Sequence, residues 1–124
     1  MAFSHFRASR KPSGGRYKRT RSHPIKERGS EPMNTRIDAT RVKTINGLGF
    51  TTKRKAFSIK EVTVMVEGKA VKTEMTSVLE NPANRNYVRR NIITKGTIVD
   101  TPKGKVRITN RPSQEGNALG VLIE

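Results

Sequence analysis

Two adjacent arginines stand between an asparagine-rich turn and an apolar pair. The stretch is ENPANRNYVRRNIITKG, residues 80 to 96, with Arg89 and Arg90 just before Ile92 and Ile93. The guanidinium group is a planar fork that donates two hydrogen bonds to one phosphate. Because the isoleucines are expected to enter the core, they would fix the arginines and reduce the side-chain entropy lost on binding. The pattern predicts a rigid mount for phosphate contacts.

Arg85 belongs to the same segment, in which Tyr87 and Val88 are expected to fix the chain to the body of the protein. The alternative is that these arginines pair with Glu80 or Asp100 on the protein's own surface. Such surface pairs typically contribute less than about 1 kcal/mol. Ion pairing alone would therefore not explain why the arginines lie between a turn and two core residues. We therefore expect Arg85 to bind RNA together with its neighbours.

The N-terminal arm carries a second group of cations, mixed with aromatic rings. Phe3, Phe6 and Tyr17 are suited to stacking on exposed bases while the cations follow phosphates. A Pro-Ser-Gly-Gly bend interrupts the arm at residues 12 to 15. The alternative function, a solubilising or localisation tail, requires neither rings nor a bend. The predicted RNA-binding residues of the arm are Arg7, Arg10, Lys11, Arg16, Tyr17, Lys18, Arg19 and Arg21.

Three further cations lie between two phenylalanines in FTTKRKAF, residues 50 to 57. We expect a basic loop tip that contacts RNA, with Phe50 and Phe57 in the core, since large apolar side chains are usually buried. The predicted RNA-binding residues of this loop are Lys53, Arg54 and Lys55.

Catalytic chemistry has little support in the sequence. The two histidines, His5 and His23, both lie in the arm, whereas general acid–base catalysis needs groups held within hydrogen-bond reach. The acidic residues are dispersed without metal-ligand spacing, and the chain has no cysteine for a disulfide or a thiolate metal site. We expect no enzymatic activity, cofactor, metal or small-molecule substrate. An enzyme acting on RNA is an alternative that turnover by the isolated protein would reveal.

The overall charge indicates a polyanionic partner. The 124 residues include 26 Lys and Arg against 10 Asp and Glu, a formal net charge of +16. Such self-repulsion disfavours a compact protein unless a polyanion such as nucleic acid neutralises it. A membrane partner is a weaker alternative, because no apolar run approaches the roughly 20 residues of a spanning helix and the arm lacks an amphipathic stripe. No apolar signal core follows the first residues, so we expect a cytoplasmic location.

Charge and hydropathy divide the chain into two parts. Residues 1 to 55 carry 15 basic and 3 acidic side chains, while residues 56 to 124 carry 11 and 7. Residues 1 to 36 have too few apolar side chains to offset the entropy of ordering, so we expect a basic arm that is disordered without RNA. Residues 37 to 124 are expected to form an RNA-binding β-barrel domain.

Short alternating strands are predicted in this second part. EVTVMVEGKAVKTEM places Val62, Val64 and Val66 on one face, followed by a turn at Glu67 to Lys69 and renewed alternation. GTIVDTPKGKVRIT repeats this hairpin pattern, TRVKTI is a less regular strand, and LGVLI is a last one.

About six strands in so short a region favour a mainly β fold, a small closed or nearly closed barrel, because closure removes exposed edges. One short helix is expected at residues 83 to 89, after Asn81 as a cap and Pro82 in the first turn.

The run SVLENPANRNYVRRNIITKGTIVDT, followed by GKVRITNRPSQEG and VLI, strongly resembles the archaeal and eukaryotic-type small-subunit ribosomal protein family numbered eight (eight-e). RKPSGGR near the start and RVK at residues 41 to 43 follow the family's order, so the resemblance covers nearly the whole chain. The short length is similar to the archaeal form. NGLGFTTKRKAF departs from the Gly-Gly-Asn loop that is usual there.

The resemblance implies a β-barrel protein of the small ribosomal subunit that binds ribosomal RNA beside neighbouring ribosomal proteins and has no enzymatic activity. A ribosome-assembly factor using the same barrel is the alternative. The family's basic pattern falls on Arg10, Lys11, Arg16, Arg41, Lys43, Arg89, Arg90, Lys95 and Arg111, and weakly on Arg85.

Overall fold

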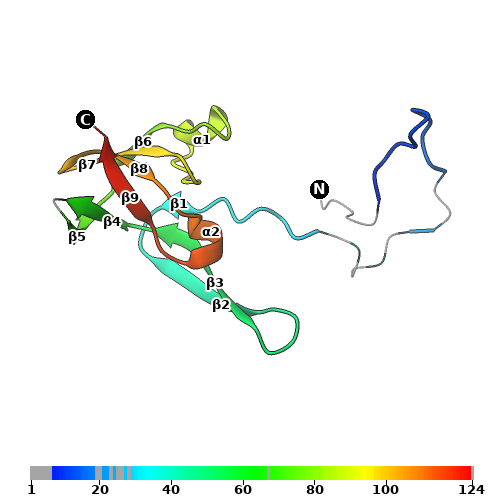
Figure 1. Ribbon diagram of the computed structural model, residues 1–124, viewed down its shortest axis with the longest axis horizontal. Helices are drawn as coiled ribbons and strands as arrows, with labels where there is room; N and C mark the ends of the chain where they lie inside the picture. The colour runs from blue at the N-terminus through cyan, green and yellow to red at the C-terminus, as the bar shows by residue number, and fades with distance from the viewer. Residues whose placement is uncertain are drawn as a thin grey trace. The chain divides into compact units, whose positions relative to one another are not determined.

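The computed structural model describes residues 7–18, 21–22, 24, 27, 29–66 and 68–123. The chain forms two compact units, Met1–Pro32 and Met33–Glu124. Within the described residues the fold is mainly β, as the sequence predicts, and the strands belong to the second unit (Figure 1).

The described part of the second unit contains nine strands and two single-turn helices. They are β1 (Arg36–Ile37), β2 (Arg41–Asn46), β3 (Thr52–Ile59), β4 (Glu61–Val66), β5 (Lys69–Glu74), β6 (Ser77–Glu80), α1 (Asn86–Arg89), β7 (Ile98–Thr101), β8 (Gly104–Ile108), α2 (Pro112–Glu115) and β9 (Leu119–Ile123).

The larger sheet has six strands in the order β5-β4-β9-β8-β7-β6. All neighbours are antiparallel except β4 and β9, which run parallel. The predicted hairpins are confirmed as β4–β5 and β7–β8, and LGVLI as β9. Alternation places one face of these strands in the core. Its fully buried aliphatic residues include Val62, Val64, Val99, Val106 and Ile108.

The six-stranded sheet is open, so the predicted closed or nearly closed barrel is not confirmed. Its edge strands β5 and β6 are consecutive in the chain, yet no ladder joins them in the described structure. The backbone amides of the two residues between β5 and β6 donate to different parts of the sheet. Met75 N donates to Lys60 O, just before β4, and Thr76 N donates to Asp100 O in β7, each at 2.9 Å. The link therefore passes from the β4–β5 hairpin to β7 without pairing β5 with β6.

The smaller sheet has the order β1-β3-β2, in which β2 and β3 form an antiparallel ribbon. TRVKTI is confirmed as β2, but the predicted loop at residues 50 to 57 is largely strand β3. The prediction that Phe50 and Phe57 lie in the core is wrong, since their side chains are 110% and 37% exposed. Phe57 alternates with buried Ala56 and so faces outward, while Phe50 lies in the turn before β3.

Both helices differ from the sequence expectation. The helix predicted at residues 83 to 89 is confined to α1, and Arg85 occupies its N-cap position without a side-chain cap bond. The second helix, α2, was not predicted; it has Pro112 in its first turn, and Gly116 at its end is in the left-handed region at φ 77°. A Cβ on Gly116 would lie 3.0 Å from Arg54 Cβ and 3.2 Å from Val42 Cγ1, so α2 packs closely on the ribbon.

Candidate nucleic-acid interface

The outward face of the β2–β3 ribbon brings four predicted cations together. Cross-strand partners point to the same side of a sheet, and the register pairs Lys43 with Lys55 and Ile45 with Lys53. Alternation adds Phe57 to this side, and the guanidinium carbon of Arg41 lies 5.8 Å from the centre of the Phe57 ring. We call Arg41, Lys43, Lys53, Lys55 and Phe57 the ribbon face.

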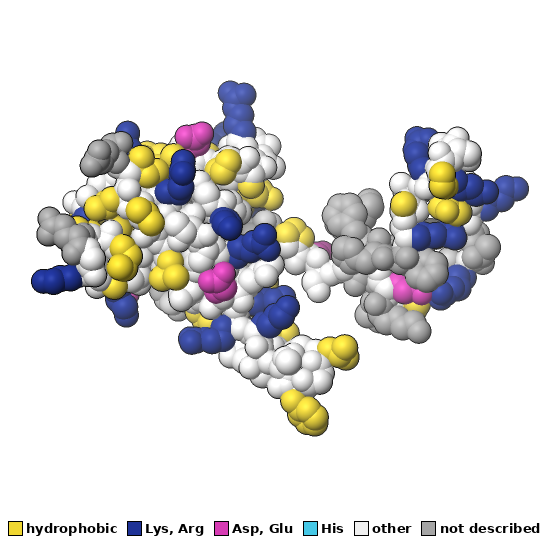
Figure 2. All heavy atoms as spheres, in the orientation of Figure 1, with side chains coloured by type: hydrophobic (Ala, Val, Ile, Leu, Met, Phe, Trp, Pro, Cys, Tyr) yellow, Lys and Arg dark blue, Asp and Glu magenta, His cyan; other side chains and the backbone are white. Residues whose placement is uncertain are grey.

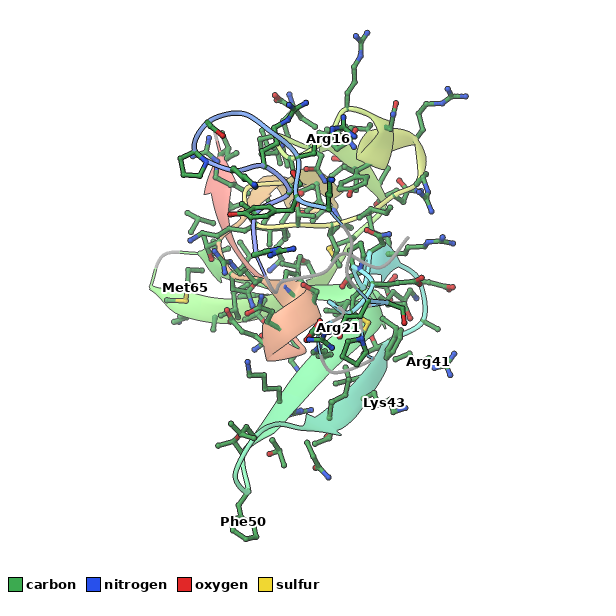
Figure 3. All side chains as sticks on the ribbon, turned by 90° about the vertical axis from the view of Figure 1, so that its right-hand side faces the viewer. Arg16, Arg21, Arg41, Lys43, Phe50 and Met65 are labelled. Carbon is green, nitrogen blue, oxygen red and sulfur yellow. The ribbon has the colours of Figure 1, made fainter. Side chains whose placement is uncertain are left out.

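Arg41 and Lys43 extend from the same side of β2 (Figure 3). Alternation along β2 places Arg41 on the same side as Lys43, opposite half-buried Val42, and the register with β3 shifts at a bulge between Arg41 and Val42.

No carboxylate among the described residues forms an ion pair with a cation of the ribbon face. The sequence from Ala39 to Lys60 contains no Asp or Glu. The described ion pairs are Arg21 Nη2–Glu27 Oε1 at 2.7 Å and Lys60 Nζ–Glu74 Oε1 at 3.0 Å, neither of which involves the ribbon face. Like charges directly opposite one another destabilise a strand pair. The ribbon face therefore has a positive potential that a polyanion would relieve.

Arg54 belongs to the opposite side of the ribbon. It pairs in register with Thr44, and its Cβ lies against Gly116 at the end of α2. Arg111 is the N-cap residue of that helix and its side chain is exposed. The three cations predicted as one loop tip thus divide between two sides, and Arg54 lies on the side on which α2 packs.

The arginine segment is anchored as its sequence predicts. Ile92 and Ile93 are 0% and 1% exposed, whereas Arg89 and Arg90 are exposed. Backbone bonds fold the segment back on itself, from Ile92 N to Tyr87 O at 3.0 Å, and join it to the first strand region, from Ile93 N to Thr35 O at 2.9 Å.

Asn81 acts as an internal clamp rather than as the predicted helix cap. Its buried side chain donates from Nδ2 to Ile92 O at 3.0 Å and accepts at Oδ1 from Ala83 N and from Thr94 Oγ1, each at 3.0 Å. One amide therefore joins the beginning and the end of the segment that displays the arginines. We call residues 81–94 the clamped loop.

The alternative of ion pairing with Glu80 or Asp100 is not observed: in the described structure no ion pair involves Arg85, Arg89 or Arg90. Lys95 follows the clamped loop and is exposed, and Gly96 behind it packs on Pro82, where an added Cβ would lie 3.2 Å from Pro82 Cγ. Four exposed cations therefore belong to this one region. Figure 2 shows the wider setting, with more Lys and Arg than Asp and Glu side chains on the visible face.

Arg36 is a cation that sequence reasoning missed. It forms an isolated antiparallel bridge with Ile92, and the next amide, Ile37 N, donates to Asn91 O at 3.0 Å. The backbone of Arg36 therefore lies beside that of Asn91 and Ile92, and its side chain is exposed. The only sequence indication was its position just before the predicted domain, because a two-residue strand leaves no alternation pattern.

In the first unit the predicted bend is formed by a tight turn. Arg10 and Arg16 form an antiparallel bridge, and Lys11 N donates to Gly15 O at 2.8 Å. The Tyr17 ring has the Arg7 guanidinium carbon 4.0 Å from its centre and Lys11 Nζ at 5.7 Å. Arg10, Lys11, Arg16 and Lys18 are exposed, and Arg21 pairs with Glu27.

Some predictions fall outside the described residues. These are Phe3, His5, Phe6, Arg19 and His23. Among the residues that are described, no group of three or more His, Cys, Asp or Glu side chains is placed to hold a metal ion. No described helix has the length and apolar character needed to cross a membrane.

Comparison with known proteins identifies the family. The family model described as ribosomal protein S8e matches residues 4–123. A small ribosomal subunit protein eS8 from Methanobrevibacter smithii is 41% identical over 125 residues, covering 99% of this chain and 100% of that protein. Proteins of the same name from Methanocorpusculum labreanum and Methanosphaera stadtmanae are each 46% identical over 117 residues, covering 93% of this chain and 94% and 93% of theirs. The chain therefore belongs to the ribosomal protein S8e family.

Proposed function

We propose that this protein is a structural component of the small ribosomal subunit, without catalytic activity, and that it binds ribosomal RNA in the cytoplasm. Neighbouring ribosomal proteins would be its other partners. Membership of the S8e family supports the ribosomal role, since its relatives are named as small-subunit proteins. The cations described above support RNA as the direct ligand.

The ribbon face is the main observation that supports RNA binding. Lys43 and Lys55 are held directly opposite each other without a carboxylate on either strand, an arrangement that is unfavourable in the free protein. Phosphates spaced along an RNA backbone would convert this repulsion into attraction and release condensed counterions. The arrangement is thus expected to be favourable only in the presence of a polyanion.

The clamped loop would supply a second set of contacts. Arg89 and Arg90 extend from a segment whose backbone is fixed by the Asn81 amide and by buried Ile92 and Ile93. A fixed backbone reduces the ordering cost of binding, and bidentate guanidinium groups suit phosphate geometry. The first unit, with exposed Arg10, Lys11, Arg16 and Lys18, would extend the basic surface along the RNA.

Salt-dependent binding tests this proposal. The full chain would be titrated against small-subunit ribosomal RNA at several salt concentrations, in parallel with Arg89→Ala/Arg90→Ala. Each phosphate contact adds about 0.7 to 0.9 to the slope of log affinity against log salt, so the double variant should lose roughly 1.5. A wild-type affinity that barely responds to salt would rule out the proposed function.

Two further variants serve as controls. Arg89→Lys/Arg90→Lys should keep the slope but lower the affinity, because the charge remains while the fork is lost. Lys69→Ala/Lys72→Ala removes the same charge from exposed positions on β5 and should change the slope less. Circular dichroism must show the folded spectrum for each. Stoichiometric presence in washed mature subunits would separate a structural component from an assembly factor, which would be found only on precursors.

A further inference from the structure

The turn between β2 and β3 carries two apolar side chains that contact almost nothing in the described structure. Leu48 is 96% exposed and Phe50 110% exposed, the highest values among the large hydrophobic residues. Figure 3 shows Phe50 at the end of the ribbon, directed away from the rest of the unit. Single exposed apolar residues need no explanation, but two at one projecting tip form a distinct contact surface.

Hydrogen bonds and close packing define the conformation of this tip. Gly47 N donates to Thr51 O at 2.6 Å, and Thr51 Oγ1 donates to Leu48 O at 2.9 Å. Gly47 is required, because an added Cβ would lie 2.6 Å from Thr51 Oγ1. The turn is therefore a closed structure that holds Leu48 and Phe50 outward.

The backbone of Phe50 is itself unusual. Its φ is +49°, in the left-handed region that bulky L-residues rarely occupy, and Gly49 before it has φ +59°. Such a conformation is strained and persists only where the surrounding structure determines it. Phe50 lies inside the turn that these hydrogen bonds close, and its ring extends at the end of the ribbon (Figure 3).

The flanks of the tip indicate its partner. The ribbon behind it bears Lys43, Lys53 and Arg54, and no acidic residue occurs between Ala39 and Lys60. A protein surface that received an apolar tip would be expected to offer carboxylates to these cations or to be neutral, whereas RNA offers phosphates beside an apolar base face. An aromatic ring leading a cationic stem is the chemistry that stacks on an unpaired base or enters an opened base step.

We propose that the β2–β3 tip is a base-stacking wedge: Phe50, supported by Leu48, packs on an unpaired or unstacked RNA base while the cations of the ribbon hold the adjoining phosphates. This inference rests on the proposed RNA binding and adds a specific contact to it. It also assigns a role to the NGLGF sequence.

The experiment uses full-length chains with a single tryptophan, since the natural sequence contains none. Phe50→Trp places the indole at the tip, and Met65→Trp places it at an exposed apolar position on β4, in the other sheet. On titration with small-subunit ribosomal RNA, stacking should quench the Phe50→Trp fluorescence strongly and leave Met65→Trp less affected. Equal quenching of both, or of neither, would overturn the wedge.

Affinity measurements complete the test. Phe50→Ala should weaken binding about 5- to 150-fold, the range of one stacked base, with the salt slope unchanged because no phosphate contact is lost. A completely paired RNA duplex should bind wild type and Phe50→Ala equally. If wild type binds RNA with a steep salt slope but Phe50→Ala binds as well, the wedge fails while the proposed function stands.

A protein pocket as the real partner would give another result. The Phe50→Trp emission would then stay unquenched on naked RNA and shift to the blue only in assembled subunits, which would overturn the RNA wedge. Absence of salt-dependent binding by the wild type would instead remove the proposed function itself.

Discussion

Reversing one charge on the ribbon face should stabilise the free protein while weakening its binding to RNA. Lys43 lies directly opposite Lys55, which is half-buried. Directly opposed like charges destabilise a strand pair, and opposite charges stabilise it by about 0.2–1 kcal/mol. Lys43→Glu removes the repulsion between two lysines and replaces it with an attraction between glutamate and Lys55. The free energy of unfolding should therefore rise by about 0.5–2 kcal/mol at low salt. For a domain of this size, each kcal/mol corresponds to about 4–8 °C in Tm.

Urea and thermal unfolding at low ionic strength would measure this change. The gain should shrink at 1 M salt, where the Debye length is about 3 Å. In RNA titrations, the same variant should lose about 0.7–0.9 or more of the salt slope, because one phosphate contact is lost and a repulsive charge is added. Stability and affinity thus move in opposite directions.

Lys72→Glu on β5 is the matched control. It changes the net charge equally, but Lys72 pairs in register with neutral Thr63. A general effect of lowering the charge of +16 would raise the Tm of both variants alike. That result, or a lower Tm for Lys43→Glu, would refute the argument that the Lys43–Lys55 pair is strained in the free protein.

Two predictions concern the body of the second unit. Gly120→Ala places a Cβ 2.3 Å from Val106 Cγ1 and 3.0 Å from Arg107 O. This overpacking should lower the free energy of unfolding, measured in urea melts, by about 1–3 kcal/mol or more. Gly15→Ala is the control and should not lower it, because the nearest atom to its added Cβ is Ser13 Oγ at 3.8 Å. Asn81→Ala leaves Ile92 O, Ala83 N and Thr94 Oγ1 without the amide and should cost about 2–3 kcal/mol. Asn84→Ala, which removes one exposed bond to Asn86 N, should cost less than about 1 kcal/mol; equal losses for the two would show that the clamp is unimportant.

Alternation predicted the strands whose two faces differ clearly. Val62, Val64, Val106 and Ile108 are all buried, and Arg107 between the last two is exposed. Alternation did not predict the first half of β3, because its residues Lys53, Arg54 and Lys55 are three consecutive cations and no apolar residue marks the inner side. Arg54 occupies the inner side near the end of the ribbon, where its Cβ packs on Gly116, so the sequence shows no apolar position there.

Pairing between distant segments was not predictable from local pattern. β1 has two residues and is defined by its partners Ser58 and Ile59, and β6 is defined by β7. The open form of the six-stranded sheet was likewise not predictable, because no periodicity encodes that the Met75 and Thr76 amides bond to Lys60 O and Asp100 O. By contrast, α2 was missed although its sequence carries a signal. Proline commonly begins a helix and glycine commonly follows one, and Pro112 and Gly116 hold these two positions.

There is a physical reason why Arg89 and Arg90 lie between an asparagine-rich turn and two isoleucines. A turn that starts with Asn-Pro is followed by a single helical turn, which has too few internal hydrogen bonds to be stable alone. The Asn81 amide compensates by bonding to both ends of the loop, and Ile92 and Ile93 anchor its return in the core. Neither Asn81 nor the isoleucines reach the surface, so substituting them should alter RNA binding only by releasing Arg89 and Arg90. Retained RNA affinity in an Asn81→Ala chain with a mobile loop would show that a fixed mount is unnecessary.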